Sequence, residues 1–211
     1  FKMNLTIAIS GLPGSGNSTT GKLLAEKLSM DYFSAGKLVK DVAMGSYENQ
    51  DYFSEFKKLC DEKGLLIPNM NSENESTAAF NHWNTDFGKS SLFNNTLDNL
   101  QVKLGEKGNM VIEGKIALHM IKSANLKIWI KADFDVRVKR TSERDKISIE
   151  EAKKLLSERQ EIERKELKRI YGLDLLKQEN LADLVIDTSD ITPHEITEKI
   201  INFMNNKLLN H

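Results

Sequence analysis

The most informative part of the sequence for the fold is Leu5-Thr6-Ile7-Ala8-Ile9-Ser10, followed by Gly11-Leu12-Pro13-Gly14-Ser15-Gly16-Asn17-Ser18-Thr19. The first six residues form a short apolar run, which predicts a buried parallel strand. The glycines and proline that follow predict a loop. Apolar residues then recur at helical spacing, at Leu23, Leu24, Ala25 and Leu28. We therefore expect a strand, a glycine-rich loop and a helix from Ser18 to about Leu28.

The loop matches the pattern of a phosphate-binding P-loop in its first glycine, its sixth-position glycine and its hydroxyl residue. Glycines let successive backbone N–H groups turn inward around phosphate oxygens, and the helix that follows presents its positive N-terminal dipole to the same anion. Ser18 is placed to ligate magnesium. The expected nucleotide-binding residues are Gly11, Gly14, Ser15, Gly16, Asn17, Ser18 and Thr19.

Asn17 departs from the pattern, because this position normally carries a lysine that balances the charge moving during phosphoryl transfer. An amide cannot supply that charge. Three interpretations follow: another cation substitutes for the lysine, the enzyme is slow, or the chain binds nucleotide without turning it over.

Three later runs repeat the strand signal, at Met110-Val111-Ile112, Leu126-Lys127-Ile128-Trp129-Ile130 and Leu184-Val185-Ile186. Helical material separates them, and strands that alternate with helices imply a parallel α/β sheet. Ser148 with Glu151 and Thr192 with Glu195 each fit a capping box, so we expect helices to begin there. The first should run from about Ile149 to Ile170, and the second closes the chain.

Composition narrows the class of protein further. Its 211 residues suit one domain, and 30 Lys and Arg against 31 Asp and Glu give no steering toward nucleic acid or acidic membranes. No apolar run approaches the roughly 18 residues of a membrane span, so we expect a cytoplasmic protein. Cys60, the single cysteine, should be inert packing. Between Pro68 and Asn95 the composition shifts to Asn, Ser, Thr and Glu, which predicts a surface insertion or mobile flap.

From Leu5 to about Ile201 the chain resembles the cytidylate kinases, most closely their archaeal-type branch. In that branch the loop is similar to GxPGSGTTT, so a neutral residue already occupies the lysine position. The resemblance implies the P-loop nucleoside monophosphate kinase fold, with a parallel five-stranded sheet flanked by helices. It implies one kinase domain over residues 3–211, a monophosphate-binding insertion at 36–108 and a lid region at 141–165.

The resemblance also implies how the acceptor nucleotide is held. Tyr32-Phe33-Ser34-Ala35-Gly36 is similar to the family's second strand and the turn that begins the monophosphate-binding region. Two arginines that the family tends to use for the acceptor phosphate are lysines here, which keeps the charge but loses the bidentate fork. The implied acceptor-side residues are Ser34, Lys40, Asp98, Gln101 and Lys115. Glu113, at a strand end, could have a structural role or an acceptor-side one.

The segment from Asp133 to Arg140 resembles the passage from helix to lid, in which arginines converge on the transferring phosphoryl group. The segment from Glu158 to Arg164 resembles the branch as well. Spacing alone would equally describe a solvated, charged helix. The resemblance singles out as catalytic candidates Arg140, Arg144, Arg159 and Arg164.

Together these features predict magnesium-dependent transfer of the γ-phosphoryl group of ATP to CMP or dCMP. The expected partners are small-molecule nucleotides, with no nucleic acid and no membrane, and we expect a monomer. One alternative is a kinase of the same fold with another acceptor, such as AMP, UMP or a small-molecule alcohol. Another is a catalytically weak nucleotide-binding regulatory protein, for which Asn17 is the motive.

Overall fold

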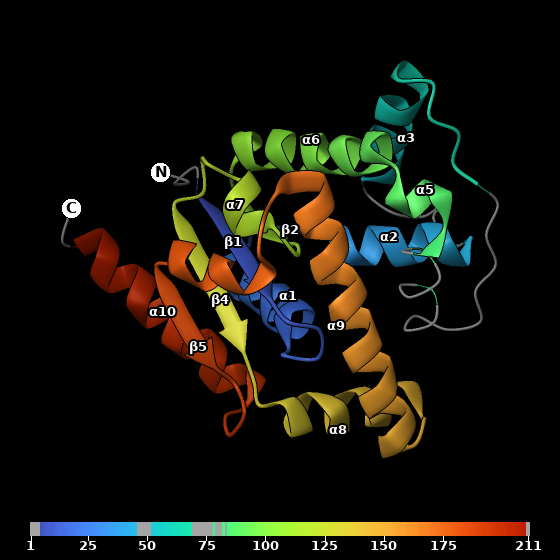
Figure 1. Cartoon of the computed structure of the whole chain (residues 1–211). Helices are drawn as coiled ribbons and strands as arrows, with labels where there is room; N and C mark the ends of the chain where they lie inside the picture. The colour runs from blue at the N-terminus through green and yellow to red at the C-terminus, as the bar shows by residue number, and fades with distance from the viewer. Residues whose placement is uncertain (1–4, 46–51, 69–77, 79–81, 83, 210–211) are drawn as a thin grey trace.

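A parallel sheet forms the centre of the computed structural model, which describes residues 5–45, 52–68, 78, 82 and 84–209. Its strand order is β2-β3-β1-β4-β5 (Figure 1). The strands are β1 (Thr6–Gly11), β2 (Asp31–Ser34), β3 (Met110–Glu113), β4 (Leu126–Lys131) and β5 (Leu184–Asp187). All neighbouring strands pair in parallel. The predicted five-stranded parallel α/β fold is confirmed.

Helices cover both faces of the sheet. One face packs against α1 (Asn17–Leu28) and α10 (Pro193–Leu209). The other packs against α2 (Ala35–Met44), α3 (Phe53–Glu62), α6 (Ser91–Lys107), α7 (Ala117–Met120) and the 3-10 helix η1 (Leu175–Leu181). Because both faces are covered, the strands are nearly continuous apolar runs.

Alternation along each strand divides the core into two layers. In β1, Ile7 and Ile9 face α1 and α10, while Ala8 faces the opposite layer. In β4, Ile128 lies in the first layer and Trp129 in the second, where Trp129 is buried core as its strand position predicts. The parallel arrangement brings the carboxyl ends of all strands to one edge, where ligands of open α/β sheets bind.

Two further helices, α8 (Phe134–Asp145) and α9 (Ile149–Tyr171), extend from this edge. Figure 1 shows α9 running from α8 at the bottom of the view up toward α6 near the top. Ser148 and Glu151 form the predicted capping box, and Gly172 ends the helix at φ 67°, a left-handed conformation that glycine adopts readily. Thr192 and Glu195 cap α10 in the same reciprocal way.

The region between Pro68 and Asn95, expected to be a surface insertion or mobile flap, contains several buried residues among its described ones. Ala78 and His82 are fully buried and Phe93 is nearly so. The His82 ring packs against Phe93 at a centroid distance of 4.7 Å. For these three residues the prediction of a surface position is wrong, because the polar composition around them gives no sign of their burial. The exposed residues of the same stretch are Asn84, Asp86, Lys89, Ser91 and Leu92. Residues 69–77, 79–81 and 83 lie outside the described part of the chain.

Two expectations from composition can be compared with the structure. Cys60 is buried in the core beside α6, and burial raises the pKa of its thiol to about 11, which is the environment of an inert packing residue. Among the described helices, none has the length and apolar character that a membrane span requires.

Candidate active site

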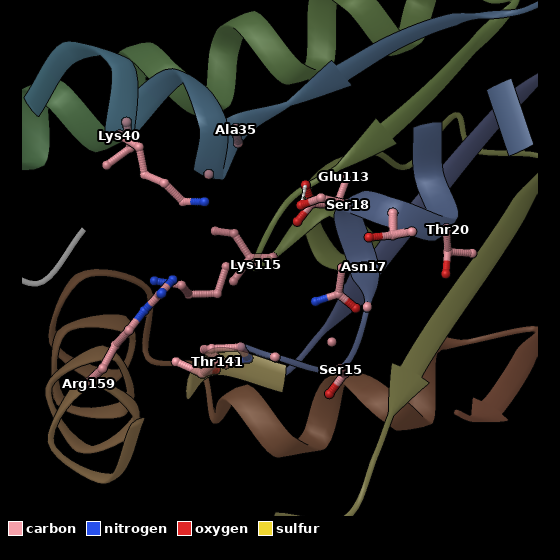
Figure 2. A pocket seen from close by; sticks show the side chains of 18 of the residues that line it. Ser15, Asn17, Ser18, Thr20, Ala35, Lys40, Glu113, Lys115, Thr141 and Arg159 are labelled. Atoms are coloured by element: carbon pink, nitrogen blue, oxygen red, sulfur yellow. Dashed lines mark hydrogen bonds between the residues drawn. The ribbon is translucent and has the colours of Figure 1, made fainter. Parts of the chain in front are cut away.

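A cavity of about 500 Å³ opens at the carboxyl edge of the sheet. The P-loop forms its base, and α2, α6, α8 and α9 contribute its walls. Figure 2 shows Lys40, Lys115 and Arg159 approaching the space above the loop from three different elements. The volume is that of a pocket that encloses small molecules. All the expected P-loop residues thus line one cavity together with Lys40, Asp98, Gln101 and Lys115, whereas Ser34 is not among its lining residues.

The P-loop has the backbone geometry that phosphate binding needs. Gly14 and Gly16 have φ of 82° and 96°, in the left-handed region that L side chains rarely adopt. A Cβ on Gly14 would also lie 3.0 Å from Arg137. Gly16 is the N-cap of α1 and, having no side chain, makes no cap hydrogen bond to the first amides of that helix. These amides and the helix dipole are left to an anionic ligand.

Asn17 bonds to its own loop rather than reaching across the cavity. Its Nδ2 donates to the carbonyl oxygen of Leu12 at 3.3 Å. Its Oδ1 is buried without a hydrogen-bond partner among the described residues, and it lies 2.4 Å from where a Cβ on Gly11 would be. Gly11 is therefore required for space. The charge that a P-loop lysine would carry has to come from elsewhere in this cavity.

Glu113, at the end of β3, gathers three hydroxyl groups. Its Oε2 accepts hydrogen bonds from Ser18 at 3.0 Å, from Tyr32 at 3.2 Å and from Ser34. Burial, followed by the Glu113 charge, raises the pKa of Tyr32, so this phenol stays a donor. Ser34 also caps α2 by accepting from the backbone N–H of Lys37 at 3.1 Å. The expected magnesium ligand and the expected acceptor contact thus share one carboxylate.

Few side chains near the P-loop could bind a magnesium ion. The described part of the chain contains no cluster of three or more His, Cys, Asp or Glu side chains able to hold a metal. Mg²⁺ in nucleotide sites is commonly bound by one or two carboxylates together with substrate phosphates and water. The Ser18 hydroxyl and the Glu113 carboxylate, beside the phosphate loop, fit that donor set.

Asp98 and Gln101 form the acceptor-side wall with Tyr171. Gln101 donates from Nε2 to Asp98 Oδ1 at 3.2 Å, and the Tyr171 hydroxyl donates to Asp98 Oδ2. Burial raises the pKa of Asp98 to about 6, although the Tyr171 hydrogen bond works in the opposite direction. Gln101 Oε1 is buried without a partner among the described residues. A Cβ on Gly114 would lie 2.4 Å from that oxygen, so Gly114 makes room for it.

Lys115 and Arg159 are both held by Glu163, whose side chain is fully buried. Glu163 Oε1 lies 2.8 Å from Lys115 Nζ and 2.7 Å from Arg159 Nε. Burial alone would raise the pKa of Glu163, but the two cations outweigh burial and lower it. Burial lowers the pKa of Lys115 to about 8 in spite of Glu163. One carboxylate thus fixes two cations that face the P-loop, with one net positive charge.

The four predicted catalytic arginines fall into different environments. Arg140 donates to the carbonyl oxygen of Ser15 at 3.4 Å and to Thr188 Oγ1 at 3.0 Å, which ties α8 to the P-loop. Arg144 pairs with Asp145 and lines the cavity, as Arg159 does.

Arg164 is not brought to this cavity. It lies 3.9 Å from Asp174 and lines a second cavity. The physical reason is helix geometry, since five residues advance the helix by about 140° and turn Arg164 away from Arg159.

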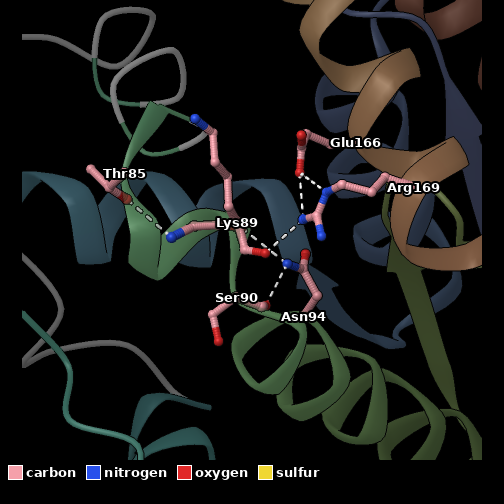
Figure 3. Close-up of polar contacts among 7 residues, drawn as sticks. Thr85, Lys89, Ser90, Asn94, Glu166 and Arg169 are labelled. Atoms are coloured by element: carbon pink, nitrogen blue, oxygen red, sulfur yellow. Dashed lines mark hydrogen bonds and ion pairs between the residues drawn. The ribbon is translucent and has the colours of Figure 1, made fainter.

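The remaining contacts hold α9 in place over the acceptor side. Arg169 donates from Nη2 to the carbonyl oxygen of Lys89 at 2.7 Å and pairs with Glu166 (Figure 3). Within the second segment, Asn94 donates to the carbonyl oxygens of Gly88 and Ser90. The Arg169 bond to Lys89 therefore joins α9 directly to the segment at residues 36–108.

Sequence reasoning missed two members of the site, Glu163 and Tyr171, and left Glu113 undecided. The spacing of Arg159 and Glu163, four residues apart on a helix, was a signal that the two side chains could pair. No comparable signal existed for Tyr171, whose partner Asp98 is 73 residues away.

Comparison with known proteins supports the family resemblance and the fold. A model of the cytidylate kinase-like family matches residues 6–190. Cytidylate kinase of Pyrococcus horikoshii is 32% identical over 195 residues, 92% of this chain and 85% of that protein. Cytidylate kinase of Methanocaldococcus jannaschii is 31% identical over 193 residues, 88% of this chain and 89% of that protein.

Among solved structures, shikimate kinase from Acinetobacter baumannii, in complex with shikimate, superposes with a TM-score of 0.56 at 14% identity. The match covers 98% of this chain and 96% of that one. At this identity the likeness concerns the fold alone. The family model and the archaeal relatives carry the assignment, and the protein belongs to the cytidylate kinase-like family.

Proposed function

We propose that the protein is a nucleoside monophosphate kinase that transfers the γ-phosphoryl group of ATP to CMP or dCMP. The observation that carries this proposal is the single cavity in which the P-loop faces Asp98, Gln101 and Lys115. Family membership and the archaeal relatives named cytidylate kinase support it. The acceptor phosphate oxygen attacks the γ-phosphorus, the bond to the β-γ bridging oxygen breaks, and ADP leaves. No protein nucleophile takes part.

In such a transfer the protein contributes positioning and electrostatic stabilisation. The loop amides hold the donor phosphates. Ser18 and Glu113 would hold Mg²⁺, which neutralises charge on the donor phosphates when it is bound. Arg140 and Arg144, from α8, line the same cavity and would add positive charge near the donor phosphates.

The charge that Asn17 cannot supply comes, in this proposal, from the Lys115 and Arg159 pair. Glu163 holds both side chains by one oxygen, so they are positioned before substrate arrives. A preorganised cation costs little reorganisation when charge develops on the transferring group. Lys40, which lines the cavity from α2, provides a further positive charge on the acceptor side.

The acceptor wall favours cytosine over uracil on chemical grounds. Cytosine carries an amino donor at the position where thymine, like uracil, carries a carbonyl acceptor. The wall presents acceptors, namely the Asp98 carboxylate and the unpartnered Gln101 Oε1. A uracil carbonyl would face these oxygens without a hydrogen bond, and such mismatches of buried polar groups give strong discrimination.

The test is a panel of acceptors, in which ADP formation is measured with CMP, dCMP, UMP, AMP and shikimate at equal concentration. We expect the largest kcat/KM with CMP or dCMP. Equal rates with purine and pyrimidine monophosphates, or activity with shikimate alone, would refute the proposal that CMP or dCMP is the acceptor.

One observation favours a second candidate, a nucleotide-binding protein that has lost turnover. Asn17 bonds to Leu12 and carries no charge toward the phosphates. Calorimetry with ATP and magnesium separates the two functions. Tight binding together with no acceptor-dependent ADP formation would establish this second function.

A further inference from the structure

A second cavity, of about 870 Å³, borders α8, α9 and the turn into η1. It lies on a different face of α9 from the candidate active site, since Gln160 and Arg164 line it while Arg159 lines the first cavity. Nothing in the proposed phosphoryl transfer uses it. Its volume falls within the range of small-molecule sites.

Positive charge dominates the lining of this cavity. Glu161 and Asp174 are its acidic residues. Its basic residues are Arg137, Arg164, Lys165, Lys168 and Lys177. A cavity lined mainly by one sign of charge raises the local concentration of oppositely charged ligands.

Both acidic residues already have partners. Glu161 pairs with Lys165 at 2.6 Å, and Asp174 lies 3.9 Å from Arg164. In the described part of the chain, Lys168 and Lys177 form no ion pair, and both are exposed. Two lysines at the cavity are thus available to an anion.

Arg137 lines the cavity from α8 and is 4% exposed. Its Nη1 donates to the carbonyl oxygen of Pro13 at 3.2 Å and to Gln160 Oε1 at 3.4 Å. Its guanidinium carbon lies 5.2 Å from the centre of the Phe134 ring. Its Nε has no hydrogen-bond partner among the described residues. A buried donor without an acceptor is costly, and a ligand oxygen would relieve that cost.

We propose that this cavity is a second binding site, for a small molecule that carries two or more phosphate groups. Lys168 and Lys177 would contact the phosphates as mobile point charges, and the Arg137 guanidinium would add a fixed donor. Occupancy would be felt at the P-loop, because Arg137 bonds to Pro13 and contacts Gly14. The site therefore fits an effector that adjusts donor binding without entering the active site.

A reporter thiol tests occupancy directly. Ser157 is exposed and lines this cavity but not the first one. The variant Ser157→Cys places a reactive thiol there, while the single natural cysteine, Cys60, is buried and has a pKa of about 11. Alkylation of Ser157→Cys by iodoacetamide is followed by mass spectrometry with ADP and, separately, with inorganic pyrophosphate. We expect the ligand to slow alkylation in a saturable manner.

The double change Lys168→Gln with Lys177→Gln, made in the Ser157→Cys protein, assigns the protection to this cavity. Each lost charged contact corresponds to about a tenfold weaker affinity. We therefore expect the half-protecting concentration to rise by roughly a hundredfold. Lys153→Gln is the matched control on α9, because Lys153 is exposed and lines neither cavity.

The outcomes separate cleanly. Protection by both ADP and pyrophosphate shows that linked phosphates suffice for binding. Protection by ADP alone shows that the nucleoside is needed as well. Either result supports the site if the double variant is no longer protected. Absence of protection by both probes overturns the proposal. So does protection of equal strength in the double variant, since the ligand would then act from the active site. Because alkylation needs no turnover, failure here leaves the kinase proposal intact.

Discussion

Asp98→Asn should stabilise the folded protein at pH 8 and at the same time weaken acceptor binding. Asp98 is 5% exposed, and its carboxylate accepts from Gln101 and from Tyr171. Burial makes ionisation of this group unfavourable, which raises its pKa to about 6. Asparagine has nearly the same shape, and its Oδ1 can still accept from Tyr171. The substitution therefore removes a buried charge while it keeps one hydrogen bond.

The size of the effect follows from the pKa. The rise from 3.8 to about 6, at ~1.4 kcal/mol per pKa unit, makes ionised Asp98 destabilising by ~3 kcal/mol. For a chain of this length, 1 kcal/mol corresponds to a change in Tm of about 2–4 °C. Loss of the Gln101 hydrogen bond offsets about 1 kcal/mol of this gain. We therefore expect Asp98→Asn to raise Tm by roughly 4–8 °C at pH 8.

The sign of the pH dependence gives the sharper test. The folded protein keeps the Asp98 proton up to pH about 6, whereas the unfolded chain releases it near 3.8. Between these values the folded state binds more protons, so wild-type stability falls as pH rises. The Tm advantage of Asp98→Asn should be small at pH 4 and full at pH 8. Circular dichroism melts without nucleotide at the two pH values measure it.

Asp190→Asn serves as the control, because Asp190 is exposed and its replacement removes the same formal charge. Its Tm difference from wild type should be nearly the same at both pH values. A Tm difference for Asp98→Asn that does not grow between pH 4 and pH 8, or a variant less stable than wild type at pH 8, would show that Asp98 is not a destabilising buried charge. Activity assays on the same protein should show a higher KM for CMP.

Three further predictions concern the cation pair, the P-loop and α9. Lys115 has a pKa of about 8, so it should lose its proton as pH rises, and kcat/KM should fall above pH 8. Lys115→Arg should shift this decrease in kcat/KM to higher pH. An unshifted pH profile would contradict a role for the Lys115 charge in catalysis. Asn17→Lys should preserve or raise kcat if Lys115 merely replaces the missing charge, and a large loss in steady-state assays would show that the space is already occupied. Ser148→Ala removes the capping box of α9 and should cost ~1 kcal/mol in denaturant unfolding, whereas an unchanged midpoint would mean that packing alone positions the helix.

Local sequence signals predicted most of the fold. The apolar run of β1 and the glycine loop identify strand, loop and helix because each depends on neighbours within a few residues. The capping boxes at Ser148 and Thr192 are equally local, and both helices begin where the sequence predicts. The polar stretch around His82 shows the limit, since a few buried side chains among many polar ones leave no periodic signal.

The candidate site was predictable in its parts but not in its arrangement. The P-loop glycines and Ser18 follow from the motif, and Arg159 and Lys115 followed only from the family resemblance. Arg164 seemed equivalent to Arg159 in the sequence, but the helix turns it toward the second cavity.

Local patterns in the sequence were enough to predict the phosphate loop, the strands β1, β3, β4 and β5, and the starts of α9 and α10, because these depend on periodicity and on caps within one or two turns. Tertiary structure alone decided that Glu163 holds Lys115 and Arg159 together, and that Tyr171 meets Asp98. These contacts join α6, α9 and the residues after β3, which are distant in the chain. Their energies depend on burial, which only the packed protein defines.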